Sequence, residues 1–199
     1  MTDIRGYVLA GGKSSRMGSD KALLEIEGQT VIERQCQLLV PFCEQGVLIA
    51  GARSTELSNF SWPVVHDSSI DQGPLFGIVS ALEHAESGIA VILAVDLLAI
   101  GSADISAVLQ ACSQDVDSDF DVFFAQSRQD PSVHGAQPLF AAWRVESSLP
   151  VLRQQLEQGQ RSVMKAWLGL KRQGVLISDS HLVNINSLGD YDNFLRAKG

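Results

Sequence analysis

The sequence lacks the features that mark an exported or membrane-spanning chain. It has three cysteines, an odd number with no Cys-x-x-Cys pair, which indicates free thiols in a reducing compartment. Residues 1–7 contain no apolar signal core. The most apolar run, residues 89–100, is interrupted by Asp96 and falls short of the roughly 20 residues that a membrane helix needs. We therefore expect a cytoplasmic protein with no membrane partner.

The sequence also has few positively charged residues. The chain has 15 lysines and arginines against 23 aspartates and glutamates, so its net charge is -8 and its overall field repels polyanions. This argues against a nucleic-acid partner, and any bound phosphate needs a local basic site. Hydrophobic residues make up 45% of the sequence, which is typical of a packed globular protein. The composition therefore predicts one domain over residues 1–199.

Short apolar runs alternate with segments of helical periodicity along the whole chain. The run at 89–95 is apolar at every position, which is typical of a strand covered on both faces in a parallel sheet. Thr30, Pro74 and Ser162 are suited to the first positions of helices. We expect strands over residues 4–10, 47–50, 63–66, 89–95, 121–125, 137–143, 175–177 and 183–185, and helices over residues 31–43, 74–86, 104–112, 151–158, 163–170 and from 188. This alternation predicts a doubly wound α/β domain with a mostly parallel sheet and helices on both faces.

A glycine-rich loop, LAGGKSSRMGSDK at residues 9–21, follows the first expected strand. Ligands of open α/β sheets bind beyond the carboxyl ends of the strands, which is where this loop begins. Gly11 and Gly12 permit close backbone approach, and Arg16 and Lys21 would add positive charge. The spacing matches neither a Walker A loop nor GxGxxG, so phosphate binding and a plain glycine-rich turn both remain open.

Two aspartates follow expected strands and are candidates for the same site. Asp96 ends the most apolar strand, where a carboxylate needs a cation or hydrogen-bond donors. Mg²⁺ coordination and a capping or turn role are both open for it. Asp67, in the segment VVHDSS, is a weaker candidate, because a turn aspartate is the default interpretation there.

The loop at residues 9–21 resembles the signature of the molybdenum cofactor guanylyltransferases, approximately LAGGxSxRMGxDK. Four further segments follow in the family's order: VVHDSSIDQGPLFG, the apolar strand into Asp96, RSVMKAW at 161–167 and VNINSLGDY at 183–191. The resemblance implies a Rossmann-like nucleotidyltransferase fold. It also implies transfer of GMP from Mg·GTP to the terminal phosphate of molybdenum-carrying molybdopterin, with release of pyrophosphate.

Site residues carried over from the resemblance fall into two groups. The N-terminal half would form the nucleotide site, in which Arg16, Lys21 and Asp96 are catalytic and Asp96 holds Mg²⁺. The C-terminal half would form the acceptor site, and molybdoenzymes or their chaperones would be further partners. The nucleotide-binding residues are Leu9, Ala10, Gly11, Gly12, Lys21, Asp67 and Asp96, and the acceptor candidates are Arg161, Lys165, Asn184 and Asn186.

The spacing of these acceptor candidates would allow each pair to share a face. Arg161 and Lys165 are four residues apart at an expected helix start, so both can face one side. Asn184 and Asn186 alternate along an expected strand and would share a face. The alternative is a solvated basic helix face and a pair of asparagines that form turns.

The sequence departs from the family pattern at two positions. Leu98 stands where the family usually has the proline of a D-x-P turn, which removes a backbone constraint beside Asp96. Ala50 replaces an asparagine that is common after the second strand. These departures keep open a weakly catalytic nucleotide-binding or cofactor-carrier protein. A cytidylyl- or sugar-phosphate nucleotidyltransferase is also open, although the pair Gly11–Gly12 favours GTP.

Overall fold

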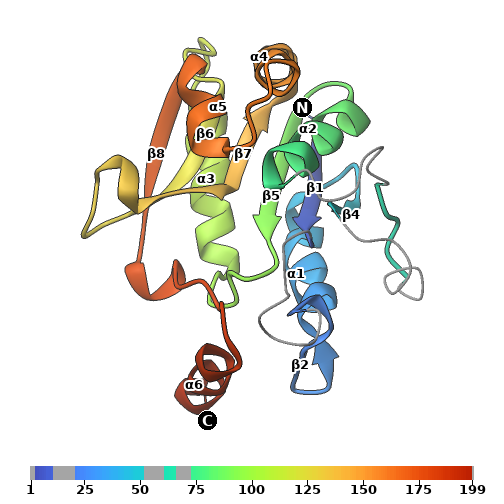
Figure 1. The fold of residues 1–199 in the computed structure, drawn as a ribbon, viewed down its shortest axis with the longest axis vertical. Coiled ribbons are helices and arrows are strands. Elements are labelled where there is room, and N and C mark those ends of the chain that lie inside the picture. The colour runs from blue at the N-terminus through green and yellow to red at the C-terminus, as the bar shows by residue number, and fades with distance from the viewer. Residues whose placement is uncertain (1–2, 11–20, 52–60, 66–72, 199) are drawn as a thin grey trace.

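The computed structural model describes residues 3–10, 21–51, 61–65 and 73–198. These residues form a six-stranded sheet, a small two-stranded sheet and six α-helices (Figure 1). The strands are β1 (Ile4–Leu9), β2 (Glu25–Ile26), β3 (Gln29–Thr30), β4 (Val47–Ala50), β5 (Ile89–Ala94), β6 (Val122–Ser127), β7 (Ala136–Arg144) and β8 (Arg172–Ile177). The α-helices are α1 (Val31–Leu39), α2 (Pro74–Ala85), α3 (Ser102–Gln114), α4 (Val145–Glu157), α5 (Val163–Ala166) and α6 (Leu188–Lys198).

The main sheet is mostly parallel. Its strand order is β4-β1-β5-β7-β6-β8, and β7 runs antiparallel to both of its neighbours. The pairs β1–β4, β1–β5 and β6–β8 are parallel. Pro138 lies where the pairing of β6 with β7 shifts register, at a position where a missing N–H costs the ladder little. The expected doubly wound α/β fold is therefore confirmed.

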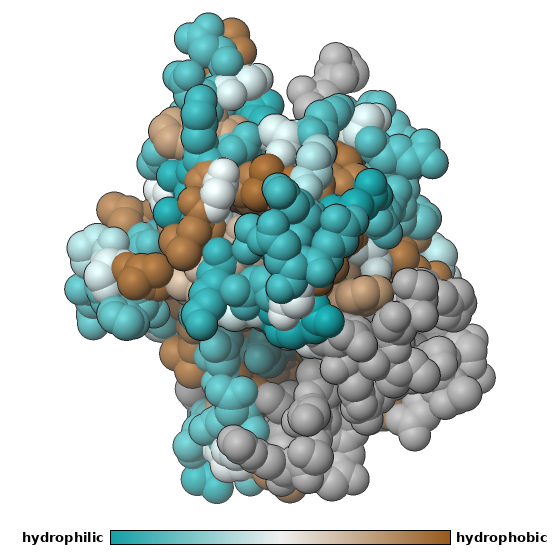
Figure 2. Space-filling model, turned by 45° about the horizontal axis from the view of Figure 1, so that its top comes forward, coloured by the Kyte–Doolittle hydropathy of each residue, from teal (hydrophilic) through white to brown (hydrophobic). Residues whose placement is uncertain are grey.

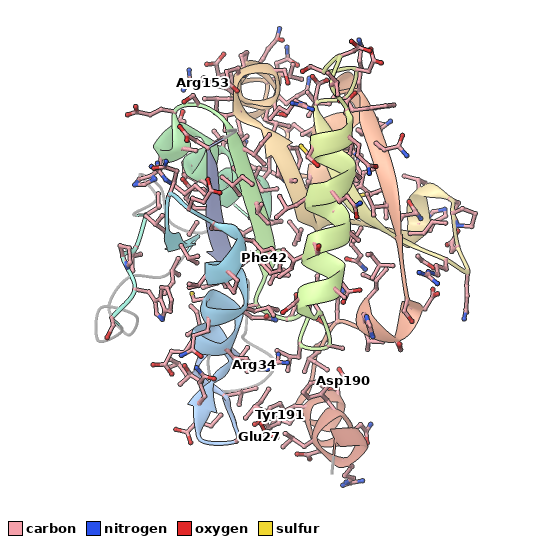
Figure 3. The ribbon with its side chains drawn as sticks, turned by 180° about the vertical axis from the view of Figure 1, so that it is seen from behind. Glu27, Arg34, Phe42, Arg153, Asp190 and Tyr191 are labelled. Atoms are coloured by element: carbon pink, nitrogen blue, oxygen red, sulfur yellow. The ribbon has the colours of Figure 1, made fainter. Side chains whose placement is uncertain are left out.

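Helices cover both faces of the sheet, and the alternating side chains of the strands divide the core between those faces. Val8 packs on one face with residues of α1 and α3, whereas Tyr7 and Leu9 pack on the other with residues of α2, α4 and α5. Figure 3 shows α1 and α3 in front of the sheet. Every side chain of β5 is buried, as its uninterrupted apolar run predicts.

Local sequence signals explain where helices α1 and α2 begin. Thr30 caps α1 in a capping box: its Oγ1 accepts from the Glu33 N–H at 3.4 Å, and Glu33 Oε2 accepts from the Thr30 N–H at 3.2 Å. α2 begins with Pro74 after Gly73, whose φ of 86° is accessible to glycine at little cost. Both starts agree with the expectation from sequence.

Several expected element boundaries need correction. Residues 61–65 contain a single parallel bridge, between Val64 and Ile49, and not a full strand. Residues 183–185 form no strand, and α4 begins at Val145 instead of residue 151. The expected helix over 163–170 is the four-residue α5 followed by a 3-10 turn, and the Ser162 side chain makes no capping hydrogen bond.

The C-terminal helix α6 lies beyond the edge of the main sheet at which β1 and β5 end (Figure 1). It reaches the small β2–β3 sheet, because the Tyr191 hydroxyl donates to the backbone carbonyl of Glu25. Hydrophilic residues cover most of the described surface on the face shown in Figure 2, and hydrophobic residues lie among them in smaller groups. Within the described residues, no helix has the length and apolar character that crossing a membrane requires.

Candidate functional site

The carboxyl ends of β1, β4 and β5 meet at one edge of the sheet. Leu9, the last residue of β1, is in register with Ala50 of β4 and Ala94 of β5. The pairing extends one residue further, since Ala10 N–H donates to the Ala50 carbonyl at 3.0 Å. Leu9 and Ala10 are both buried, so the chain enters the glycine-rich loop from a fixed point. This edge is where an open α/β sheet presents its ligand site.

Asp96 lies at this edge, two residues beyond the end of β5. Its side chain is half-buried. Val95 N–H donates to the Leu9 carbonyl at 3.1 Å, which keeps the start of the turn against β1. The Asp96 carbonyl in turn accepts from the Ile185 N–H at 3.0 Å. The arrangement holds one carboxylate next to the exit of β1.

The turn after Asp96 is tied to helix α1 by two side chains that the sequence analysis missed. Gln35 Nε2 donates to the Leu97 carbonyl at 2.8 Å, and Arg34 Nη1 donates to the Leu98 carbonyl at 2.7 Å. Desolvation lowers the pKa of Arg34, and the charge of Glu27 partly offsets that effect. The available signal was a glutamine at position 35, on the buried stripe of α1.

The start of α2 packs tightly against the same edge. A Cβ added at Gly77 would lie 3.1 Å from Leu9 Cδ2 and 3.4 Å from the Gly51 Cα, so glycine allows this close approach. A helix N-terminus has unpaired N–H groups and a partial positive charge, both of which suit an anion. One Cβ placed at Gly73 would lie 3.9 Å from the Arg161 carbonyl oxygen, so the segment at Arg161 also reaches this helix start.

Part of the expected nucleotide site lies outside the described residues. Gly11, Gly12, Arg16 and Asp67 belong to that part. Lys21 begins a short 3-10 helix that ends at Leu23, and its side chain is likewise outside the description. Their expected roles stay predictions. Of the nucleotide-binding set, the structure brings Leu9, Ala10 and Asp96 to one edge of the sheet.

Arg161 and Lys165 are both exposed, but they do not form the expected helix face. Arg161 precedes α5, and its Nη1 donates to the carbonyls of Leu156 at 3.2 Å and Gln160 at 3.1 Å. Those bonds orient the guanidinium toward the carbonyl end of α4. Lys165 lies within the four-residue helix α5, whereas Arg161 lies outside it.

Asn184 and Asn186 belong to an irregular segment and not to the expected strand. Ile185 between them is buried, and its N–H is the group that pairs with Asp96. The N–H of Asn186 donates to Asp190 Oδ2 at 2.9 Å, and Asp190 N–H donates to Ser187 Oγ at 3.1 Å at the start of α6. The segment is thereby held beside Asp96 without the regular inter-strand hydrogen bonds of a β-sheet.

Asp96 is a described residue at this edge whose carboxylate could contribute to a metal site. Among the described residues, no group of three or more His, Cys, Asp or Glu side chains could hold a metal ion. Mg²⁺ is commonly bound by one or two carboxylates together with substrate phosphates and water. Among the described residues, the Asp96 carboxylate beyond the end of β5 is compatible with that mode.

The three cysteines are buried free thiols. Burial raises the pKa of Cys36 and of Cys43 to about 12, and it also raises the pKa of Cys112. A thiol reacts as the thiolate, so these groups are packing residues and not nucleophiles. Their free state agrees with the free thiols that the sequence indicates.

Comparison with known proteins identifies relatives over nearly the whole chain. Residues 6–173 match the family model described as the MobA-like NTP transferase domain. An Opitutus terrae protein named "Probable molybdenum cofactor guanylyltransferase" is 31% identical over 173 residues, which cover 85% of this chain and 80% of that protein. The family match includes most of β1, all of β5 and the residues at which both strands end.

Solved structures share the fold. The crystal structure of molybdopterin-guanine dinucleotide biosynthesis protein A from Archaeoglobus fulgidus has a TM-score of 0.75 and 19% identity, with 97% of each chain covered. A Mycobacterium tuberculosis protein solved as a complex with manganese has a TM-score of 0.68 and 15% identity, with 98% of this chain and 99% of that chain covered. At these identities the likeness concerns the architecture of the domain.

Proposed function

Because this chain belongs to the MobA-like NTP transferase family and is a nucleotidyltransferase, we propose that it transfers GMP from Mg·GTP to molybdenum-carrying molybdopterin. An oxygen of the molybdopterin terminal phosphate forms a bond to the α-phosphorus of GTP. The bond between the α-phosphorus and the bridging oxygen breaks, and pyrophosphate leaves. The names of relatives that match nearly the whole chain or most of it support this reaction.

The observation that carries the proposal is the position of Asp96 relative to Leu9. β1 and β5 end in register, so Asp96 and the start of the glycine-rich loop lie at one edge of the sheet. The acceptor phosphate already carries its nucleophilic oxygen. Catalysis therefore requires positioning and charge neutralisation more than covalent help from the protein.

The nucleotide side of the proposed site combines the loop with the start of α2. Gly11 and Gly12 would let backbone N–H groups approach phosphate oxygens, and Arg16 and Lys21 would neutralise the triphosphate. Leu9 and Ala10 would line the guanine side, and Asp67 would contact the nucleotide. Asp96 would hold Mg²⁺, which supplies charge neutralisation on the phosphates when bound.

The acceptor side is proposed to lie between the two C-terminal segments. Asn184 and Asn186 flank the residue that pairs with Asp96, and each amide can donate to and accept from a pterin or phosphate edge. Arg161 and Lys165 would supply positive charge to the acceptor phosphate. Molybdoenzymes or their chaperones would receive the product, and the site of action would be the cytoplasm.

The test of the function is a transfer assay with the full chain, GTP, Mg²⁺ and molybdenum-loaded molybdopterin. We expect pyrophosphate and the guanine dinucleotide to form in equal amounts, and neither product without the acceptor. GTP should bind more tightly than CTP or ATP in direct titration. Tighter CTP binding with CMP transfer would support a cytidylyltransferase instead, and nucleotide binding without transfer would support a carrier.

The basic residues of the loop provide a second test. Charge-assisted hydrogen bonds from Arg16 or Lys21 to phosphate contribute roughly 1.5–3 kcal/mol each. Arg16→Ala and Lys21→Ala should therefore weaken GTP binding about tenfold or more. Lys171→Ala is the matched control, because Lys171 is exposed just before β8 begins. This is the end of the sheet opposite to the carboxyl ends of β1 and β5. Wild-type affinity in both loop variants would leave the loop a purely structural turn.

A further inference from the structure

The turn after β5 is fixed by hydrogen bonds to three consecutive backbone carbonyls. The Asp96 carbonyl accepts from Ile185 N–H at 3.0 Å. The Leu97 carbonyl accepts from Gln35 Nε2 at 2.8 Å, and the Leu98 carbonyl accepts from Arg34 Nη1 at 2.7 Å. Helix α1 thus supplies two of these donors, from adjacent residues.

The burial of these donors indicates that the contacts do more than stabilise the fold. Gln35 is fully buried, and within the described structure its Oε1 has no hydrogen-bond partner. A buried amide with one unpaired oxygen costs stability, whereas an apolar side chain of similar size would avoid that cost. The benefit of glutamine at this position is therefore the bond that it makes to Leu97.

The placement of Arg34 likewise indicates that its hydrogen bond to the turn is its main benefit. Desolvation lowers its pKa, so placing the guanidinium here also costs free energy. A leucine or methionine could cover the same apolar surface with its stem, but neither could donate to a carbonyl. Figure 3 shows Arg34 near the end of α1 that faces Glu27 and the C-terminal helix.

The sequence explains why this turn benefits from external donors. Residue 98 is leucine, so no proline ring limits the backbone between Asp96 and Ile100. The Leu97 and Leu98 side chains are buried, which fixes the turn on its core side. The two bonds from α1 fix these carbonyls, and with them the backbone turn from which the Asp96 side chain extends.

We propose that Arg34 and Gln35 are positioning residues that hold the Asp96 carboxylate in the orientation needed for the magnesium–nucleotide complex. This inference rests on the proposed role of Asp96 as the metal ligand. Displacement of a reacting or binding group by about 1 Å can cost roughly hundredfold in rate. Loss of the hydrogen bond from Arg34 or from Gln35 should therefore affect metal binding and turnover more than it affects GTP binding by the loop.

The test compares Gln35→Leu and Arg34→Met with Arg144→Met in the full chain. Arg144 is the matched control because it also donates from a partly buried guanidinium to backbone carbonyls, those of Cys112, Asp115 and Phe120. The Cys112 carbonyl lies in the last turn of α3, and the carbonyls of Asp115 and Phe120 lie in the α3–β6 connection. Mn²⁺ affinity in the presence of GTP, measured by electron paramagnetic resonance, is the first readout, and deuterium exchange at residues 97–100 is the second.

We expect the two α1 variants to bind Mn²⁺ about tenfold more weakly. Deuterium exchange at residues 97–100 should be faster in both, since the hydrogen bonds from Arg34 and Gln35 hold that segment. In the transfer assay, kcat should fall about tenfold while KM for GTP changes less than about twofold. Arg144→Met should keep the wild-type Mn²⁺ affinity even if its melting temperature falls. Arg34→Lys, which keeps one donor, should recover part of the Mn²⁺ affinity lost in Arg34→Met.

Wild-type Mn²⁺ affinity and exchange in both α1 variants would overturn the inference, as would a lower melting temperature with unchanged Mn²⁺ affinity. If Gln35→Leu does not fold, the pair Arg34→Met and Arg34→Lys decides the question. Failure of the proposed function gives a different result. The wild type would then transfer no GMP, while weaker Mn²⁺ binding in the variants would still support the positioning role.

Discussion

Ile185 donates its backbone N–H to the carbonyl of Asp96, with nitrogen and oxygen 3.0 Å apart. The two residues are far apart in the sequence, and the bond brings the C-terminal segment to the end of β5. A shift in residues 184–186 is thus transmitted directly to the backbone of the proposed metal ligand. The nucleotide and acceptor sides of the proposed site share this contact.

Asp96→Asn should reduce GMP transfer at least about hundredfold, because it removes the negative charge and keeps the shape of the side chain. Its melting temperature should remain near that of the wild type, since no core volume is lost. A transfer assay and a thermal melt measure the two quantities. Asp117→Asn, at an exposed position after α3, is the control and should remain fully active. Near-normal transfer by Asp96→Asn would remove this residue from the mechanism.

Arg161→Ala and Asn186→Ala should weaken molybdopterin binding about tenfold or more while sparing GTP affinity. Each removes one polar group from the proposed acceptor side and leaves the glycine-rich loop intact. Fluorescence titration with molybdopterin and calorimetry with GTP separate the two ligands. Arg153→Ala is the control, because Arg153 is exposed and forms a surface ion pair with Glu83. Equal loss for both ligands would contradict the assignment.

Gly77→Ala should destabilise the protein by about 1 kcal/mol, since overpacking against Leu9 outweighs the gain in helix propensity. GTP affinity should fall as well if the start of α2 moves away from the edge of the sheet. The same change at Gly189 in α6 should have the opposite sign, because the nearest atom to its added Cβ is Ser187 Oγ at 3.6 Å. Urea unfolding of both variants would show whether their effects differ in sign.

Asp115→Asn should lower stability near neutral pH and have little effect in acid. Desolvation alone would raise the pKa of Asp115, but hydrogen bonds from the N–H groups of Phe120 and Asp119, together with Arg144, hold it below its usual value. A carboxyl whose folded pKa is lowered stabilises the fold above its unfolded pKa, about 3.9, and loses that effect as pH falls through the folded pKa.

Urea unfolding of the wild type and of Asp115→Asn between pH 3 and pH 7 tests this linkage. The difference in the free energy of unfolding should be constant above about pH 5 and shrink steadily below pH 4. A difference that does not depend on pH would mean that the Asp115 charge contributes nothing. The α3–β6 connection would then be held by the Arg144 bonds to backbone carbonyls.

The elements with strong local signals were predictable from the sequence. β5 is apolar throughout, and α1 and α2 begin at a capping threonine and at an N-terminal proline. The edge of the sheet that carries Asp96 followed from these elements, because parallel strands end together. The direction of β7 did not follow, since hydrophobic pattern does not distinguish a parallel strand from an antiparallel one.

The remaining differences arise from tertiary contacts that override local pattern. The sequence Val183-Asn184-Ile185-Asn186 alternates like a strand, yet the N–H of Ile185 pairs with Asp96 and not with a neighbouring strand. Gln35 interrupts an apolar helix stripe, but its spacing does not reveal which carbonyl it contacts. Such partners come from distant elements, so a single sequence does not identify them.

The contact between Tyr191 and the carbonyl of Glu25 has a consequence for biosynthesis, because 166 positions separate the two residues in the chain. At roughly 5–20 residues per second, the ribosome adds Tyr191 about 8–33 seconds after Glu25. The β2–β3 hairpin, which follows the glycine-rich loop, therefore emerges long before α6 can cover it. The hydrogen bond from Tyr191 to the Glu25 carbonyl can form only after translation has passed this part of α6.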